Sequence, residues 1–120
     1  MTYETKSSKG YDGWQATSEA EIGQTAEGPR ILKLRTAKAR GGLAASASVC
    51  IRKNAAQAGF MCETTEIFGD FYKSGIALTE CRRVTEKAVL EVHSRALQGM
   101  DSLIVEAQEF YRNREAQQAA

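Results

Sequence analysis

Cysteine and histidine are the side chains in this sequence that could ligate a metal ion or act as nucleophiles. The chain has three cysteines and one histidine: Cys50, Cys62, Cys81 and His93. Four such ligands match the number that a structural zinc ion needs. Zinc ligands usually come in close pairs such as C-x-x-C, whereas these are 12, 19 and 12 residues apart. We therefore expect no metal site, and we expect reduced, buried thiols in a cytoplasmic protein.

Catalysis and nucleotide binding also lack a supporting motif. A Cys-His nucleophile needs an orienting third group and an oxyanion hole, and the spacing around His93 indicates neither, so we expect a packed side chain there. The glycines at 10, 13, 41 and 42 match neither GxGxxG nor GxxxxGK[ST]. The sequence predicts neither an enzyme nor a bound cofactor.

A block of basic residues is the feature best suited to bind a ligand. The whole chain holds 16 Lys and Arg against 15 Asp and Glu, a net charge of +1, yet residues 30–54 contain no acidic side chain. The basic residues of this block are Arg30, Lys33, Arg35, Lys38, Arg40, Arg52 and Lys53. Such a block can attract a polyanion at short range. Alternatively, these cations lie on the solvent side of a hairpin and oppose edge pairing.

Four aromatic residues follow the basic block and offer stacking platforms for unpaired bases. Phe60 and Phe68 fit ordinary core positions. Phe71 and Tyr72 are adjacent, so in a strand their side chains point to opposite faces of the sheet. One of the two therefore faces away from the core.

The segments that must position these side chains alternate with a period of two, which predicts strands. Three such segments cover residues 14–22, 31–37 and 43–52, although Ser18 and Glu21 would also suit a helix capping box. The glycine pair at 41–42 predicts a turn, so the second and third segments form a hairpin. Its outward face is a flat floor of small residues with charged edges, made of Lys33, Arg35, Ala44, Ser46, Ser48 and Arg52.

Two further strands are expected, over residues 60–68 and about 71–82, separated at Gly69-Asp70. For the second of these, an early helix capped by Thr79 is the alternative. From Thr85 the apolar period lengthens to about 3.5, which predicts a helix capped by Thr85 and running to Tyr111. Gly99 interrupts the pattern at a cost of about 1 kcal/mol relative to alanine, so a break there is also possible.

Strands followed by a helix predict an α+β fold: an antiparallel β-meander of four to five strands, with a long C-terminal α-helix packed on one face. We expect one domain over residues 14–112, a flexible N-terminal arm over 1–13 and a frayed tail over 113–120. Mean hydropathy is −0.40. No apolar run approaches the length of about 20 residues that spans a bilayer, so no membrane association is expected.

The predicted helix is longer than its sheet is wide. It would extend about 40 Å at 1.5 Å per residue, against about 19 to 24 Å for four or five strands side by side. The overhang would expose Met100, Leu103, Ile104, Ala107, Phe110 and Tyr111. We therefore expect a homodimer joined through this segment, with a monomer whose broken helix folds back as the alternative.

These features together predict a small dimeric nucleic-acid-binding protein that favours single strands. Phosphates would be contacted by Lys33, Arg35, Lys38, Arg40, Arg52 and Lys53, and bases would stack on Phe71 or Tyr72. The predicted layout resembles that of the Whirly proteins and the related transcriptional-coactivator single-strand binders, and this architectural resemblance implies single-strand binding. The alternative is a protein-interaction module, accessory or inhibitory, with no nucleic-acid ligand.

Overall fold

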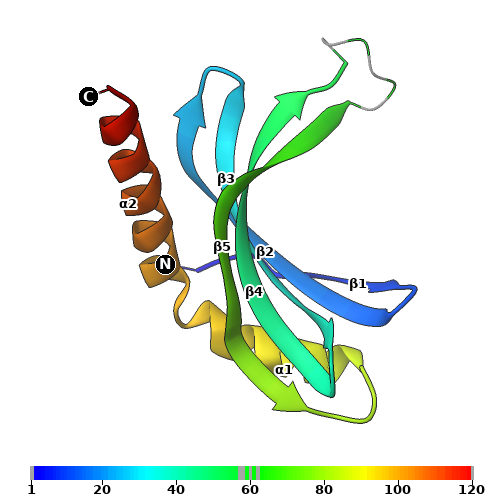
Figure 1. Ribbon diagram of the computed structural model, residues 1–120. Helices are drawn as coiled ribbons and strands as arrows, with labels where there is room; N and C mark the ends of the chain where they lie inside the picture. Colours follow the sequence, from blue (N-terminus) through cyan, green and yellow to red (C-terminus); the bar gives the residue numbers. More distant parts are fainter. Residues whose placement is uncertain (1, 57–58, 60, 62, 120) are drawn as a thin grey trace.

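The fold is a five-stranded antiparallel sheet followed by two helices, seen in a computed structural model that describes every residue except 1, 57–58, 60, 62 and 120 (Figure 1). The strands lie side by side in the order of the sequence, so the sheet is a meander. The elements are β1 (Lys6–Gly10), β2 (Gly13–Thr25), β3 (Gly28–Ala39), β4 (Gly42–Asn54), β5 (Thr64–Glu80), α1 (Glu86–Leu97) and α2 (Met100–Ala119). This confirms the predicted α+β architecture.

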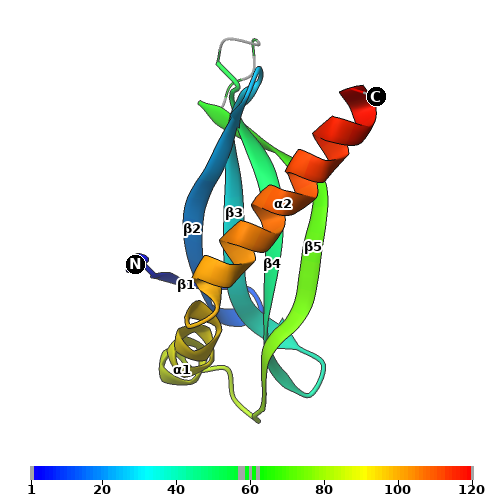
Figure 2. The same cartoon turned by 90° about the vertical axis from the view of Figure 1, so that its left-hand side faces the viewer.

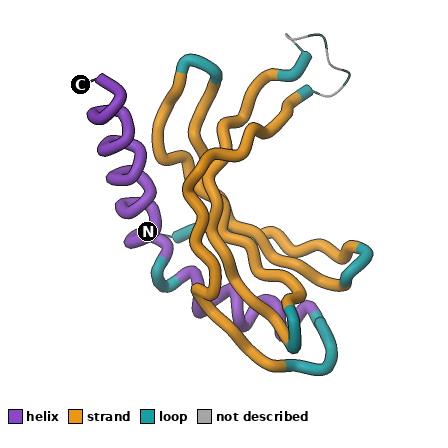
Figure 3. Tube along the Cα trace, viewed as in Figure 1, coloured by secondary structure: helices purple, strands orange, loops and turns teal. Residues whose placement is uncertain are grey.

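The sheet is bent along its strands, and both helices lie on the outside of the bend. Figures 1 and 3 show α2 beside one half of the sheet and α1 beside the other, while the inner side of the bend carries no helix. In the view turned by 90°, α2 crosses diagonally over β2 to β5 (Figure 2). The protein therefore has one face of the sheet covered by helices and one face open.

The predicted alternation decides which side chains reach the helices. In β3, Leu32, Leu34 and Thr36 are fully buried on the helix side. Their neighbours on β4, such as Ala45 and Ala47, are buried on the same side. Because side chains alternate across a strand, the intervening residues point to the open face.

The fourth and fifth predicted strands form one continuous strand, β5. Gly69 and Asp70 do not end it but lie inside it, beside one of two bulges where β5 has more residues than β4. The strand interpretation of residues 71–82 is confirmed as far as Glu80, and the alternative of a helix capped by Thr79 is wrong. Of the residues predicted to begin the fourth strand, Phe60 and Cys62 lie outside the described part of the chain.

The C-terminal helix divides at Gln98 and Gly99, so the alternative of a break is the correct one. Thr85 caps α1 as predicted, its hydroxyl accepting from the Ala88 amide. The last turn of α1 tightens, with the Gly99 amide bonding the Ala96 carbonyl, and the Gly99 carbonyl then accepts from Leu103 in α2. Because of this break, the buried apolar side chains of α1 face one half of the bent sheet and those of α2 face the other half.

Most side chains expected to be exposed for a dimer interface are instead covered by the sheet of the same subunit. Met100, Leu103, Ala107 and Tyr111 are buried, Ile104 is half-buried, and Phe110 is 39% exposed. The expectation of an overhang compared the helix with the width of the sheet, but α2 runs obliquely along the strands. A strand of 12 residues such as β3 is about 40 Å long, so these residues no longer argue for a dimer.

At both chain ends, regular secondary structure extends beyond residues 14–112. Residues 6–10, predicted as part of a flexible arm, form β1 and pair with β2. Before β1, the Tyr3 hydroxyl bonds to Asp101 and the Thr5 hydroxyl lies 3.2 Å from that of Ser18. At the other end, α2 continues through the predicted frayed tail to Ala119. β1 and the last turns of α2 therefore lie in the segments that the sequence analysis assigned to the arm and the tail.

Gly42 gives a test of the pairing between β4 and β5. A Cβ at this position would lie 2.0 Å from the Thr79 carbonyl oxygen and 2.8 Å from the Glu80 Cα, both main-chain atoms. We expect Gly42→Ala to lower the free energy of unfolding in urea by about 1 to 3 kcal/mol, because the strands must separate to admit the methyl group. Gly10→Ala is the control, since its Cβ would meet nothing within 4 Å; equal losses in both variants would contradict this explanation.

Candidate functional site

The open face of the sheet brings the predicted floor together as expected. Across β3 and β4, Lys33 pairs with Ser48, Arg35 with Ser46 and Ala37 with Ala44. On the far side of β4, Ser48 pairs with Tyr72 and Ala44 with Leu78. Small side chains on β4 therefore lie between cations on β3 and larger apolar side chains on β5, which is an edge strand.

Two of the predicted phosphate-binding cations are held in a cluster of four charges, which we call the ion quartet. Lys33 Nζ lies 2.7 Å from Glu66 and 3.6 Å from Glu19, and an Arg52 Nη lies 2.9 Å from each of the same carboxylates. The side chains come from β2, β3, β4 and β5, so the quartet spans four strands. Its formal charge is zero, which weakens its attraction for an anion.

The quartet shifts the ionisation of its own members and of the thiol beside it. Hydrogen bonding from Lys33, together with Arg52, holds the pKa of Glu66 below its usual value. Cys50 is fully buried, and on the open face it pairs with Ile31, two residues along from Lys33. Burial raises the pKa of the Cys50 thiol, with a further contribution from Glu66. This thiol is therefore protonated at neutral pH and a poor nucleophile.

The other predicted cations do not all share the open face. Arg35 does, and its Nε donates to Gln15 at 2.9 Å. Lys38 and Lys53 occupy strand positions that alternate to the helix side, where Lys53 pairs with Glu27 at 3.4 Å. Arg40 lies in the turn between β3 and β4. The open face thus carries Lys33, Arg35 and Arg52 from the predicted set.

The aromatic pair is divided between the two faces, as predicted. Phe71 is buried on the helix side, where its ring meets Phe110 edge-on at a centroid distance of 5.7 Å. Tyr72 is on the open face and is 67% exposed. Of the two candidates, only Tyr72 is placed to contact a ligand on the floor.

Sequence reasoning missed four residues of the open face. Phe68, expected in the core, is 65% exposed and pairs with Cys50, and Leu78 is 64% exposed. Phe68 and Tyr72 are four residues apart, so a simple period of two would have placed both on one face, had Gly69-Asp70 not been interpreted as a break. Glu19 and Glu66 had no comparable signal, because their position opposite Lys33 depends on the register between strands distant in sequence.

His93 is a packed side chain, as its isolated position suggested. It is buried, its Nε2 lies 2.8 Å from the Ser18 hydroxyl and its Nδ1 lies 2.9 Å from the Thr36 hydroxyl. These contacts fasten α1 to β2 and β3. Within the described ranges, no three His, Cys, Asp or Glu side chains gather closely enough to hold a metal ion.

His93 makes stability dependent on pH. Burial lowers the pKa of the imidazole from 6.5, so below about pH 6.5 the unfolded chain takes up a proton that the folded protein excludes. The free energy of unfolding should therefore fall as the pH drops below that value, by at most about 1.4 kcal/mol per pH unit for one group. Urea unfolding of the wild type and His93→Gln between pH 7.5 and pH 5.5 measures this; equal slopes would contradict it.

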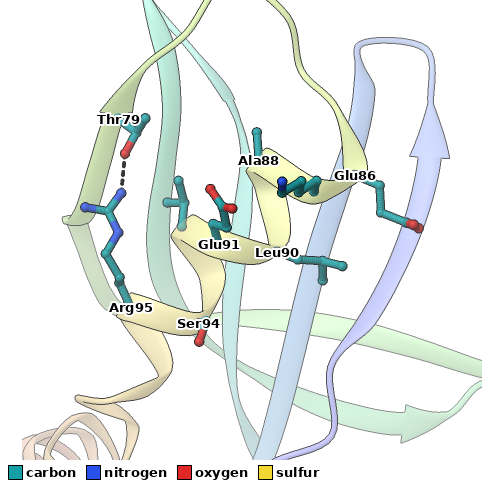
Figure 4. A pocket seen from close by; sticks show the side chains of 9 residues that line it. Thr79, Glu86, Ala88, Leu90, Glu91, Ser94 and Arg95 are labelled. Atoms are coloured by element: carbon teal, nitrogen blue, oxygen red, sulfur yellow. Dashed lines mark hydrogen bonds between the residues drawn. The ribbon is translucent and has the colours of Figure 1, made fainter.

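A broad hollow of about 750 Å³ lies along the outer side of α1 (Figure 4). Its lining includes Leu90, Ser94 and Arg95, with Thr79 of β5 at one end. Arg95 bonds to the Thr79 hydroxyl, as the figure shows, and so is already engaged. Polar groups do not converge on one point here, and the open face is the stronger candidate site.

Comparisons with known proteins add no relative: no protein family, curated protein or solved structure matches this chain. The resemblance to the Whirly proteins therefore gains no support from them. Among the described residues, no helix combines the length and the apolar character needed to cross a lipid bilayer.

Proposed function

We propose that the protein binds single-stranded nucleic acid on the open face of its sheet. The observation that carries the proposal is the exposed ring of Tyr72, in line with Ser48 and Lys33 across three adjacent strands. Two inter-strand spacings separate Tyr72 from Lys33, or roughly 10 Å. A base stacked on the tyrosine would thus have its backbone within reach of a cation.

The rest of the face fits a flat, unpaired ligand. Ala44, Ser46 and Ser48 are small, so a base can approach the sheet without a clash. Phe68 offers a second ring on the same strand as Tyr72. Single strands are recognised in this way elsewhere, by aromatic rings on an uncovered antiparallel sheet combined with cations along the backbone.

The quartet limits the strength of such binding. Glu19 and Glu66 neutralise Lys33 and Arg52, which leaves Arg35 as the cation of the predicted set that lies on the open face without an acidic partner among the described residues. Binding through this face should therefore rely more on stacking than on phosphate contacts. We expect a shallow dependence on salt, of about 0.7 in log affinity per log salt for each phosphate neutralised.

The zero formal charge of the ion quartet also favours a second candidate function, in which the open face binds another protein. Phe68, Tyr72 and Leu78 form an exposed apolar row along β5, and aromatic side chains of this kind are enriched at protein interfaces. A protein ligand would use this row and would need no phosphate contact. The two candidates differ in whether an oligonucleotide binds at all.

Removing the ring of Tyr72 tests the main proposal. A stacked base contributes about 1 to 3 kcal/mol, so Tyr72→Ala should weaken binding of a fluorescent oligothymidylate by about tenfold or more in an anisotropy titration. Tyr72→Phe keeps the ring and should bind like the wild type. If the wild type binds no oligonucleotide at low salt, or if both variants bind alike, single-strand binding through this face is wrong.

Removing a carboxylate from the ion quartet should strengthen oligonucleotide binding, because Lys33 and Arg52 would then be less neutralised. Glu66→Gln removes one of the two carboxylates that hold Lys33 and Arg52, so we expect several-fold tighter oligonucleotide binding and a steeper salt dependence. Glu106→Gln makes the same change of charge on the helix side, where Glu106 pairs with Lys73. Equal tightening in both variants would show an effect of net charge alone, and would contradict a role for the quartet.

A further inference from the structure

A second cavity lies on the other side of the sheet, between the C-terminal half of α2 and the ends of β3, β4 and β5. Its volume is about 350 Å³, near the lower limit of cavities that hold small molecules. Val49 and Ile51 supply an apolar wall, and Arg30, Arg114 and Gln118 are among the polar residues that line it. The cavity thus has an apolar part and a charged part.

Arg30 is the notable side chain of this cavity. Its side chain is only 16% exposed, and its guanidinium carbon lies 4.0 Å from the centre of the Tyr111 ring, against which it is held. Its Nη1 is 3.5 Å from a Glu115 oxygen, which is long for an ion pair, and its Nε is buried with no hydrogen-bond partner in the described part of the chain. A guanidinium has five N–H donors, so Arg30 is fixed in place but poorly satisfied.

The Nε has no surface that a ligand could reach, so a ligand in the cavity would bond to the two terminal nitrogens of the guanidinium, of which Nη1 has only the long contact to Glu115. A carboxylate matches the fork of a guanidinium with two parallel hydrogen bonds. The neighbouring charges favour a single negative charge over two. Asp70, which pairs with Arg114, and Glu115 both line the cavity, and they would repel a phosphate dianion more than a carboxylate.

We propose that this cavity binds a small carboxylic acid with a flat apolar body. The carboxylate pairs with the Arg30 guanidinium on its Tyr111 support, and the body lies against Val49 and Ile51. The site is separate from the floor of the open face, so it does not depend on the proposed nucleic-acid binding.

Benzoate is the probe, with benzyl alcohol as its uncharged counterpart and phenyl phosphate as the more highly charged one. At constant ionic strength, we expect millimolar benzoate to raise the thermal midpoint and to shift the amide signals of Arg30, Ile51 and Tyr111 in a ¹⁵N spectrum. Benzyl alcohol should do neither, and phenyl phosphate should bind more weakly than benzoate. Failure of benzoate to bind at millimolar concentration, or equal binding of the alcohol, would overturn the proposal.

Substitutions of Arg30 localise the effect. Arg30→Met should lose benzoate binding and keep a thermal midpoint at or above that of the wild type, because the arginine has few partners to lose. Arg30→Lys keeps the positive charge but lacks the paired N–H donors of the guanidinium, so it should bind benzoate at least several-fold more weakly. This variant provides the test if the methionine variant does not fold. Arg83→Gln, at an exposed position before α1, is the matched control and should bind benzoate like the wild type. Unchanged binding in the lysine variant would overturn the role of Arg30.

Discussion

Both helices bury one continuous apolar stripe against a sheet that is bent along its strands, and the rest of the structure depends on this constraint. A straight helix from Thr85 to the C-terminus could follow only one half of the bend. Gly99 lies where the stripe must change direction, and the chain resumes a helix directly beyond it. Because both helices are used on the outside of the bend, the inside is left open.

The open face combines cations with their own counter-ions. Glu19 and Glu66 hold Lys33 and Arg52 in defined positions, and the cations carry little net field as a result. Ile31 and Cys50 alternate to the open side as well, yet both are buried, and Cys50 is close enough to all four members of the quartet to interact with them electrostatically. The row from Lys33 to Tyr72 remains as the place where a ligand can approach.

Local periodicity predicted which face each strand residue occupies, and with it the floor of Lys33, Arg35, Ala44, Ser46 and Ser48. A period of two is a property of a single strand, so one sequence suffices to reveal it. The partners of Lys33 and Arg52 depend on register between distant strands, which local patterns do not contain. β1 was missed because all its residues are exposed, so it has no apolar alternation to recognise.

The overhanging helix failed as a prediction for a geometric reason. Helix length was compared with the distance across the strands, whereas the helices extend along them, where β5 alone has 17 residues. The break at Gly99 was one of two possibilities in the sequence, since a glycine within a helix costs only about 1 kcal/mol. The bend of the sheet decided between them.

The bulges of β5 have a consequence for self-association. β5 is the long outer strand of the sheet, and a flat outer strand with free main-chain groups can template the addition of strands from further copies. Its pairing with β4 is irregular on both sides of Ala47, and Gly75 adopts a φ of +69° within it. These kinks interrupt the straight run of amides and carbonyls that fibril growth requires, so the edge strand with the exposed row of Phe68, Tyr72 and Leu78 is poorly suited to polymerise.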